Sequence, residues 1–167
     1  MGQAEASHPN EPEENVVGVY KYGAPDYFDA MTPEPLKFAR ELGSEGGVEL
    51  GTVLLGEDPA AAPVAMALEL PPGYTLPRHA HNTYRAEVIV RGSLLLSDGT
   101  TLGPGDVWTS GPGEFYGPHT AGPEGVLTVE IFASSAGLAP TPDPEGEEGG
   151  VEMTDAIRAK TLEAQGL

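Results

Sequence analysis

Short apolar runs separated by turn residues fill most of the chain from residue 48 onward. The runs are rich in Val, Leu and Ile, and clusters of Gly, Pro and Asp bound them, which is typical of short strands joined by turns. One such turn is predicted at residues 121–125. The spacing favours an all-β sandwich or barrel over alternating strands and helices. The predicted strands are residues 48–55, 63–70, 77–81, 86–97, 106–110, 115–119 and 126–133.

The segment before these strands has a different pattern. Residues 1–15 are acidic and almost free of apolar side chains, which predicts a disordered tail. Residues 16–28 contain more Val and Tyr and predict an extended edge segment. Thr32 as a cap, Pro33 in the first turn and Gly43 as a stop predict a short helix.

The segment after the strands predicts a linker and a helix. Residues 140–150 are rich in Pro, Gly and Glu and predict a linker with nothing to bury. Residues 151–167 predict a C-terminal helix capped by Thr154 or Asp155. The barrel domain is therefore expected to span residues 16–139.

Composition excludes several kinds of site and partner. The chain has no cysteine, so a metal ion would need nitrogen and oxygen ligands. A net charge of -18 disfavours nucleic acid and anionic membranes as partners, and reflects either a solubilising surface or a high-salt habitat. Neither a signal peptide nor an apolar run of about 20 residues is present, which predicts a soluble cytoplasmic protein.

The histidines suggest a metal site. Three of the four lie in the strand-rich region, at His79, His81 and His119. His79 and His81 are two residues apart, so in a strand both imidazoles point to the same face. A divalent cation would satisfy both rings through their nitrogens, whereas a chance pair on the solvent face is the alternative for this spacing alone.

The surroundings of this pair resemble the cupin superfamily. The resemblance covers about residues 71–132 and implies a double-stranded β-helix, a jelly-roll barrel, with one metal ion inside. It also implies a homodimer formed through edge strands, which would remove exposed edges. The residues that carry the resemblance are Gly73, His79, His81 and Gly92 in a first motif, and Pro104-Gly105-Asp106, Pro112 and a later histidine in a second.

The sequence departs from the cupin pattern at the carboxylate ligand. In the family this ligand usually stands seven residues before the glycine that corresponds to Gly92, and here that position is Arg85. Glu87 follows two residues later on the same face of the strand. It either reaches the metal through a shifted or bulged strand, or forms an internal ion pair with Arg85.

A second departure concerns the third histidine ligand. By spacing from Gly113 the family histidine would fall at about Tyr116, and His119 comes three residues later. Strict alternation would place these two side chains on opposite faces, but Gly117-Pro118 favours a bend that resets the alternation. We therefore expect His119 to be the third ligand.

The resemblance implies one divalent transition metal, Fe²⁺ first and Mn²⁺, Ni²⁺ or Zn²⁺ as alternatives. The implied metal ligands are His79, His81 and His119, with or without Glu87. A site of this kind leaves coordination positions open for a substrate or dioxygen.

Two functions are predicted from such a barrel. The first is a metal-dependent, dioxygenase-like enzyme acting on a small organic molecule, with Arg85, Glu87 and Tyr116 as candidate catalytic residues. The second is a non-catalytic cupin that binds or senses a small ligand. Arg85 favours the second, because a cation beside a metal is unfavourable unless it is neutralised. Tyr84 and Trp108 are further candidates for the pocket lining.

Overall fold

The computed structural model describes residues 18–37, 39–40 and 46–166. Almost all of its regular structure between residues 49 and 142 is strand, which confirms the predicted all-β fold. The strands are β1 (Glu49–Leu54), β2 (Val64–Leu70), β3 (Thr75–Leu76), β4 (His79–Ala80), β5 (Arg85–Leu95), β6 (Thr101–Leu102), β7 (Val107–Ser110), β8 (His119–Phe132) and β9 (Thr141–Pro142). The helical elements are α1 (Tyr27–Met31), the 3₁₀ turns η1 (Glu34–Leu36) and η2 (Ser135–Gly137), and α3 (Glu148–Ala164).

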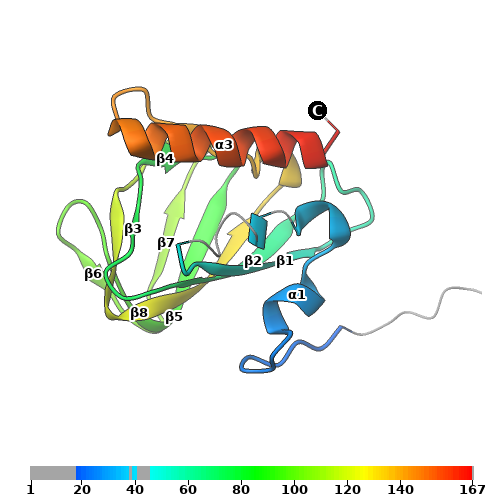
Figure 1. Ribbon diagram of the computed structural model, residues 1–167, viewed down its shortest axis with the longest axis horizontal. Coiled ribbons are helices and arrows are strands. Elements are labelled where there is room, and N and C mark those ends of the chain that lie inside the picture. The colour runs from blue at the N-terminus through cyan, green and yellow to red at the C-terminus, as the bar shows by residue number, and fades with distance from the viewer. Residues whose placement is uncertain (1–17, 38, 41–45, 167) are drawn as a thin grey trace, which may run out of the picture.

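The strands form a curled antiparallel sheet with α3 lying across one end of it (Figure 1). The order in the main sheet is β1-β2-β8-β5-β6, with β3 paired to β8 and β7 paired to β5. β4 and β9 form a separate two-stranded sheet. Because β9 leads directly into α3, this small sheet joins the predicted histidine pair to the helix.

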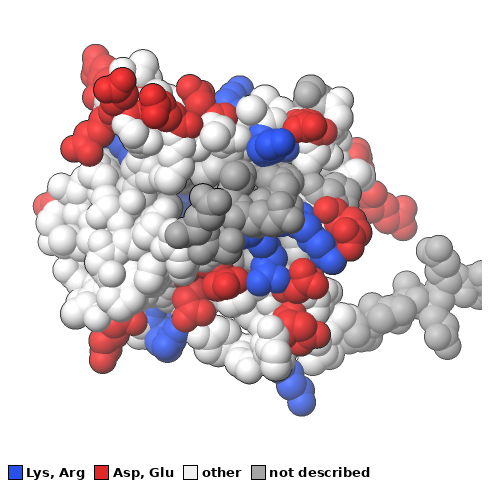
Figure 2. Space-filling view, viewed as in Figure 1, with Lys and Arg blue, Asp and Glu red and all other residues white. Residues whose placement is uncertain are grey.

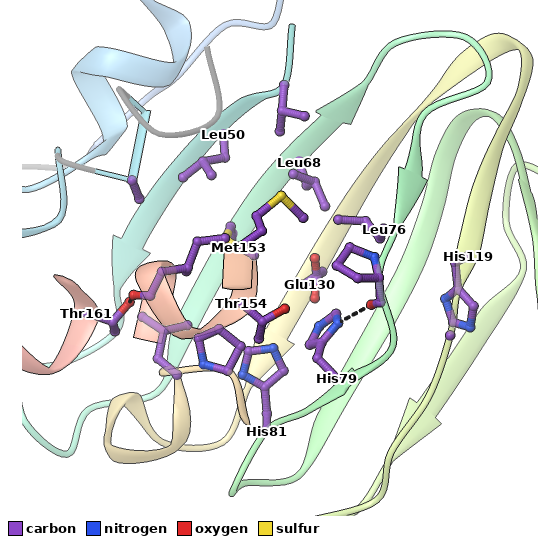
Figure 3. A pocket seen from close by; sticks show the side chains of 18 of the residues that line it. Leu50, Leu68, Leu76, His79, His81, His119, Glu130, Met153, Thr154 and Thr161 are labelled. Carbon is purple, nitrogen blue, oxygen red and sulfur yellow. Dashed lines mark hydrogen bonds between the residues drawn. The ribbon is translucent and has the colours of Figure 1, made fainter. Parts of the chain in front are cut away.

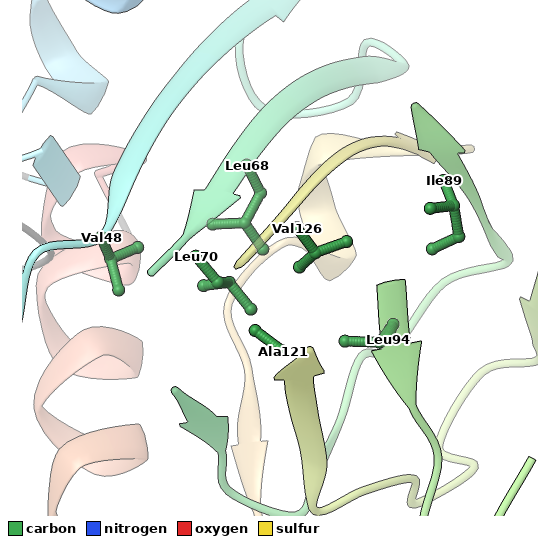
Figure 4. Packing of buried hydrophobic residues seen from close by; sticks show 7 residues of the cluster. All are labelled: Val48, Leu68, Leu70, Ile89, Leu94, Ala121 and Val126. Carbon is green, nitrogen blue, oxygen red and sulfur yellow. The ribbon is translucent and has the colours of Figure 1, made fainter. Parts of the chain in front are cut away.

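One apolar cluster lies inside the curled sheet (Figure 4). It combines strand residues that alternation turns inward with Val48, which precedes β1. Burial of such side chains is the main force that holds the barrel closed. The members are Val48, Leu68, Leu70, Ile89, Leu94, Ala121 and Val126.

The structure differs from the prediction at one turn and at one strand. The turn expected at 121–125 is part of β8, because the pairing between β5 and β8 shifts in register between Gly92 and Leu94 and absorbs the extra residues. Residues 115–119 do not form the strand expected there; Tyr116 makes a single bridge with His79.

The N-terminal expectations have mixed outcomes. The predicted edge segment contains no strand among its described residues: residues 22–26 form turns, because Gly23 adopts a positive φ of 89° and a backbone hydrogen bond closes a turn from Lys21 to Ala24, and α1 follows. The short helix expected from Thr32 to Gly43 is represented by η1 and by helical residues 39–40. The rest of that helix and the predicted tail over residues 1–15 lie outside the described residues.

The C-terminal boundaries also differ from expectation. α3 begins at Glu148, so Thr154 is not its cap; Thr154 is buried and its hydroxyl donates to the carbonyl of Gly150. The segment expected to be a linker contains β9 and the buried Asp143, which pairs with Arg78. These are tertiary contacts, which composition does not reveal. No helix of the described residues is long and apolar enough to cross a membrane.

Candidate functional site

A cavity of about 560 Å³ lies between the sheet and α3 (Figure 3). Its volume falls in the range of sites that bind small organic molecules. Most of the side chains from the sheet and from α3 that form its walls are apolar. The wall includes Leu50, Met66, Leu68, Leu76, Met153 and Ile157.

The polar lining residues contact one another and form a single polar cluster. One row of inward-facing side chains crosses the sheet at this level, with one residue from each of five neighbouring strands. The row consists of Thr52, Met66, Glu130, Glu87 and Trp108. We define the polar cluster as His79, His81, Arg85, Glu87, Tyr116 and Glu130.

Arg85 is the centre of the polar cluster. Its guanidinium donates hydrogen bonds to Glu87 and to Glu130, and all three side chains are buried. The rings of Trp108 and Tyr116 flank the guanidinium, with its central carbon 4.3 Å and 4.6 Å from their centroids. Such contacts stabilise a buried cation. Of the two alternatives predicted for Glu87, the structure contains the ion pair with Arg85.

The sequence interpretation missed Glu130. It lies in β8 within the apolar run from Val126 to Phe132, where it is the one charged residue. A carboxylate inside such a run costs free energy unless it is paired, so its position was a usable signal for a buried ion pair. It could not indicate the partner, because β5 and β8 are far apart in sequence.

The charges in the cluster are not balanced when both carboxyls are ionised. Burial raises the pKa of Glu87 to about 7, and the neighbouring Glu130 adds to this effect, while Arg85 opposes it. Near neutral pH the Glu87 carboxyl is therefore partly protonated. Burial also raises the pKa of Tyr116, so its phenol keeps its proton.

His79 and His81 are held as neutral rings. Nδ1 of His79 lies 2.8 Å from the carbonyl oxygen of Pro77, and Nδ1 of His81 lies 3.2 Å from that of Gly137. A carbonyl only accepts, so each Nδ1 carries a proton. Burial lowers the pKa of both rings, that of His81 to about 3 with a further contribution from His79 and then from Arg85.

Tyr116 occupies the place beside His79 where the resemblance implied a histidine. Its hydroxyl is 3.0 Å from Nε2 of His79 and donates to it, because Nδ1 of that ring holds the proton. His119 is buried as well and lines the same cavity, as the predicted bend at Gly117-Pro118 required. The His119 ring stacks on Tyr116, with centroids 5.6 Å apart, and stands apart from His79 and His81 in Figure 3.

These positions do not fit a resident metal ion. The guanidinium of Arg85 stands where the resemblance implied a carboxylate ligand, Glu87 is bound to it, and Tyr116 takes Nε2 of His79. In the part of the chain that the structure describes, no three His, Asp or Glu side chains are grouped so that they could hold a metal ion. A divalent ion here would also stand beside the guanidinium charge of Arg85, which only Glu130 would neutralise once Glu87 turned to the metal.

The two motif segments meet inside one curled antiparallel sheet, with His79 and His81 facing its interior beside Arg85 and Tyr116. The chain has a cupin fold. The site differs from the pattern that the resemblance implied at two ligand positions, Arg85 and Tyr116. The differences replace a carboxylate by a cation and an imidazole by a phenol.

Comparisons with known proteins support no closer assignment. No protein-family model matches this chain, and no curated protein matches it in sequence. It is similar to an RmlC-like cupin from Shewanella frigidimarina, with 20% identity over 60% of this chain and 80% of that chain and a TM-score of 0.44. A protein of unknown function with a cupin-like fold from Ralstonia eutropha is 15% identical over 76% and 81%, with a TM-score of 0.49.

An enzyme is also among the similar structures. A tryptophan-to-tyrosine variant of oxalate decarboxylase from Bacillus subtilis is 22% identical, and the match covers 53% of this chain and 26% of that chain with a TM-score of 0.43. At these identities and TM-scores the likeness carries neither activity nor metal over to this chain.

The other predicted lining residues have different outcomes. Trp108 is not among the cavity-lining residues, but it contacts Arg85 and Tyr116 of the polar cluster and also the ring of His119. Tyr84 is 69% exposed and does not line the cavity, so its expected place there was wrong. β5 turns inward at Arg85, and alternation directs the preceding side chain to solvent.

Proposed function

We propose that this cupin binds a small, largely apolar organic molecule in the cavity between the sheet and α3, with Arg85 rather than a metal ion at the polar cluster. The supporting observation is the pairing of Arg85 with two buried carboxylates at the position where a ligand carboxylate was expected. The fixed cation orders the polar cluster without a metal, and the apolar wall supplies the binding energy. This is the sensing or binding role predicted as the alternative from sequence.

The metal-dependent, dioxygenase-like enzyme is a second candidate function. One observation favours it: His79 and His81 both turn Nδ1 to a backbone carbonyl, as metal-binding histidines commonly do, which leaves Nε2 on the opposite edge of each ring. In that case Fe²⁺ or another divalent ion would be held by His79 and His81, and it would supply Lewis-acid or redox chemistry. Tyr116 and Glu87 would first have to release their present partners.

A small-molecule screen separates the two candidates. Uncharged aromatic and aliphatic compounds are added to protein treated with EDTA, and the melting temperature is measured. Saturation at a hundred times the dissociation constant should stabilise the fold by about 2.7 kcal/mol. The Met66→Trp variant, which fills the cavity from β2, should lose the shift. Shifts that require added Fe²⁺, Mn²⁺, Ni²⁺ or Zn²⁺ would favour the metal-dependent function instead.

A homodimer and a cytoplasmic location remain proposals. β1 is an edge strand of the main sheet, and pairing of such edges between copies would remove their free backbone groups. Sedimentation velocity across a range of protein concentrations tests the dimer, and a monomer at all concentrations would contradict it.

A further inference from the structure

The charges around the cavity are already paired within the protein. Arg85 is the one arginine or lysine that lines it among the described residues, and both of its carboxylate partners line it as well. The His119 ring is buried between the rings of Trp108 and Tyr116. A carboxylate ligand would therefore meet no free cation and would lie close to Glu130, at a high desolvation cost.

The roof of the cavity is apolar although it contains hydroxyl residues. Thr154 and Thr161 of α3 are buried, and their hydroxyls donate to the carbonyls of Gly150 and Ile157 on their own helix, each at 2.8 Å. Both hydroxyl donors are therefore satisfied within the helix and are not available to a ligand beside Met153 (Figure 3). The body of a ligand under α3 would contact hydrocarbon on both sides.

The outer surface near α3 disfavours anions too. Figure 2 shows acidic side chains gathered over the N-terminal end of α3 and the loop before it. The exposed acidic residues of this segment are Glu145, Glu147, Glu148, Glu152 and Asp155. Together with the net charge of -18, they lower the local concentration of anionic compounds around this end of the barrel.

Two nitrogens of the polar cluster have no hydrogen-bond partner among the described residues: Nη1 of Arg85, which is buried, and Nε2 of His81. Nε2 of His79 accepts the Tyr116 hydroxyl, whereas no donor among the described residues binds Nε2 of His81. Because Nδ1 of His81 donates to Gly137, its Nε2 is a hydrogen-bond acceptor. His81 lines the cavity, so a ligand with a hydrogen-bond donor can satisfy this nitrogen.

We infer that the ligand is an uncharged, largely apolar molecule with a hydroxyl group, an alcohol or a phenol, that donates to Nε2 of His81. The inference rests on the proposed binding function and names its ligand class. The apolar wall binds the body of the molecule, and the open acceptor selects its hydroxyl. The paired state of Arg85 excludes carboxylates of the same size.

Calorimetric titration of the EDTA-treated full-length chain with three naphthalene probes tests the inference. 2-Naphthol should bind at least about tenfold more tightly than 2-methoxynaphthalene, which has no donor, a difference of about 1.4 kcal/mol. The affinity for 2-naphthol should also exceed the affinity for 2-naphthoate, which carries a negative charge, by at least the same factor. His81→Phe should remove the preference for naphthol over its methyl ether, and His81→Gln, which keeps an acceptor, should retain part of it.

The outcomes separate the inference from the proposed function. Equal or tighter binding of 2-naphthoate would overturn the uncharged class while binding in the cavity stands. Equal binding of naphthol and its methyl ether to the wild type would overturn the hydroxyl contact, and this comparison needs no variant to fold. Binding of none of the three probes would contradict both the inference and the proposed function.

Discussion

Glu87 on β5 and Glu130 on β8 are direct partners in the antiparallel register, and both accept hydrogen bonds from Arg85. Two carboxylates opposite each other in a buried site repel one another and favour the protonated form. The guanidinium between them offsets this repulsion. Arg85, Glu87 and Glu130 therefore form an ion-pair triad within the polar cluster, and its cation is a side chain of the protein.

Removal of the cation should destabilise the fold. Arg85→Met leaves the two carboxylates buried without a partner, and we expect the free energy of unfolding to fall by about 3–5 kcal/mol at pH 8. The loss should become smaller toward pH 5, where Glu87 can take up a proton. Urea denaturation at the two pH values measures both effects.

A matched surface variant controls for the general effect of losing a charge. Lys37 pairs with Glu34 in an exposed position, so Lys37→Met should change the free energy of unfolding far less than Arg85→Met does. Losses of similar size in the two variants would mean that the triad has no special role in stability.

Acidification should destabilise the protein through His81. Its pKa is lowered to about 3, so between pH 6.5 and 3 the unfolded chain binds a proton that the folded chain does not. The free energy of unfolding should then decrease as the pH falls, by about 1.4 kcal/mol for each pH unit well below 6.5. Glu87 acts in the opposite sense between pH 4.5 and 7, because its pKa is raised and the folded chain holds the proton.

Comparison with His81→Asn isolates this contribution, because Glu87 is common to both proteins. The stability of the wild type relative to the variant should decrease from pH 6.5 to pH 5. A difference that does not change with pH would contradict a buried neutral imidazole at this position.

β5 and β8 approach each other closely at Gly92 and Gly125, and this contact predicts a loss of stability when Gly92 is replaced. Gly92 has a φ of 73°, and an added Cβ would collide with the carbonyl of Gly125. Gly99 has a similar φ of 88° in an open turn, with nothing near its Cβ position. Gly99→Ala should cost about 1–2 kcal/mol from the backbone alone, and Gly92→Ala about 1–3 kcal/mol more from overpacking. Equal losses on thermal unfolding would mean that the close approach is not rigid.

The sequence allowed prediction of the barrel, but not of which side chains pair with one another in its site. Alternating apolar runs and turn residues located β1, β2, β5 and β7, because local periodicity determines which face of a strand is buried. The alternation also placed Arg85 and Glu87 on one face. The role of Glu130 and of β9 depends on pairing across long sequence separations, which a periodic pattern does not contain.

The two departures from the cupin pattern were visible in the sequence, but their consequence was not. Spacing placed Arg85 at the carboxylate position and Tyr116 at the histidine position. We expected His119 to be the third ligand and left open whether Glu87 would reach the metal or pair with Arg85. In the structure Glu87 binds Arg85, and His119 stacks on Tyr116. The strength of a buried ion pair decides this arrangement, and it depends on burial that only the three-dimensional structure gives.

Metal content tests the central claim that Arg85 takes the place of a metal ion. The wild-type chain and His79→Ala are expressed in medium supplemented with iron, manganese, nickel and zinc, and the purified proteins are compared by elemental analysis. The account predicts far less than one metal ion per chain in the wild type, with no decrease in the variant. Near-stoichiometric metal in the wild type that is lost in His79→Ala would contradict it.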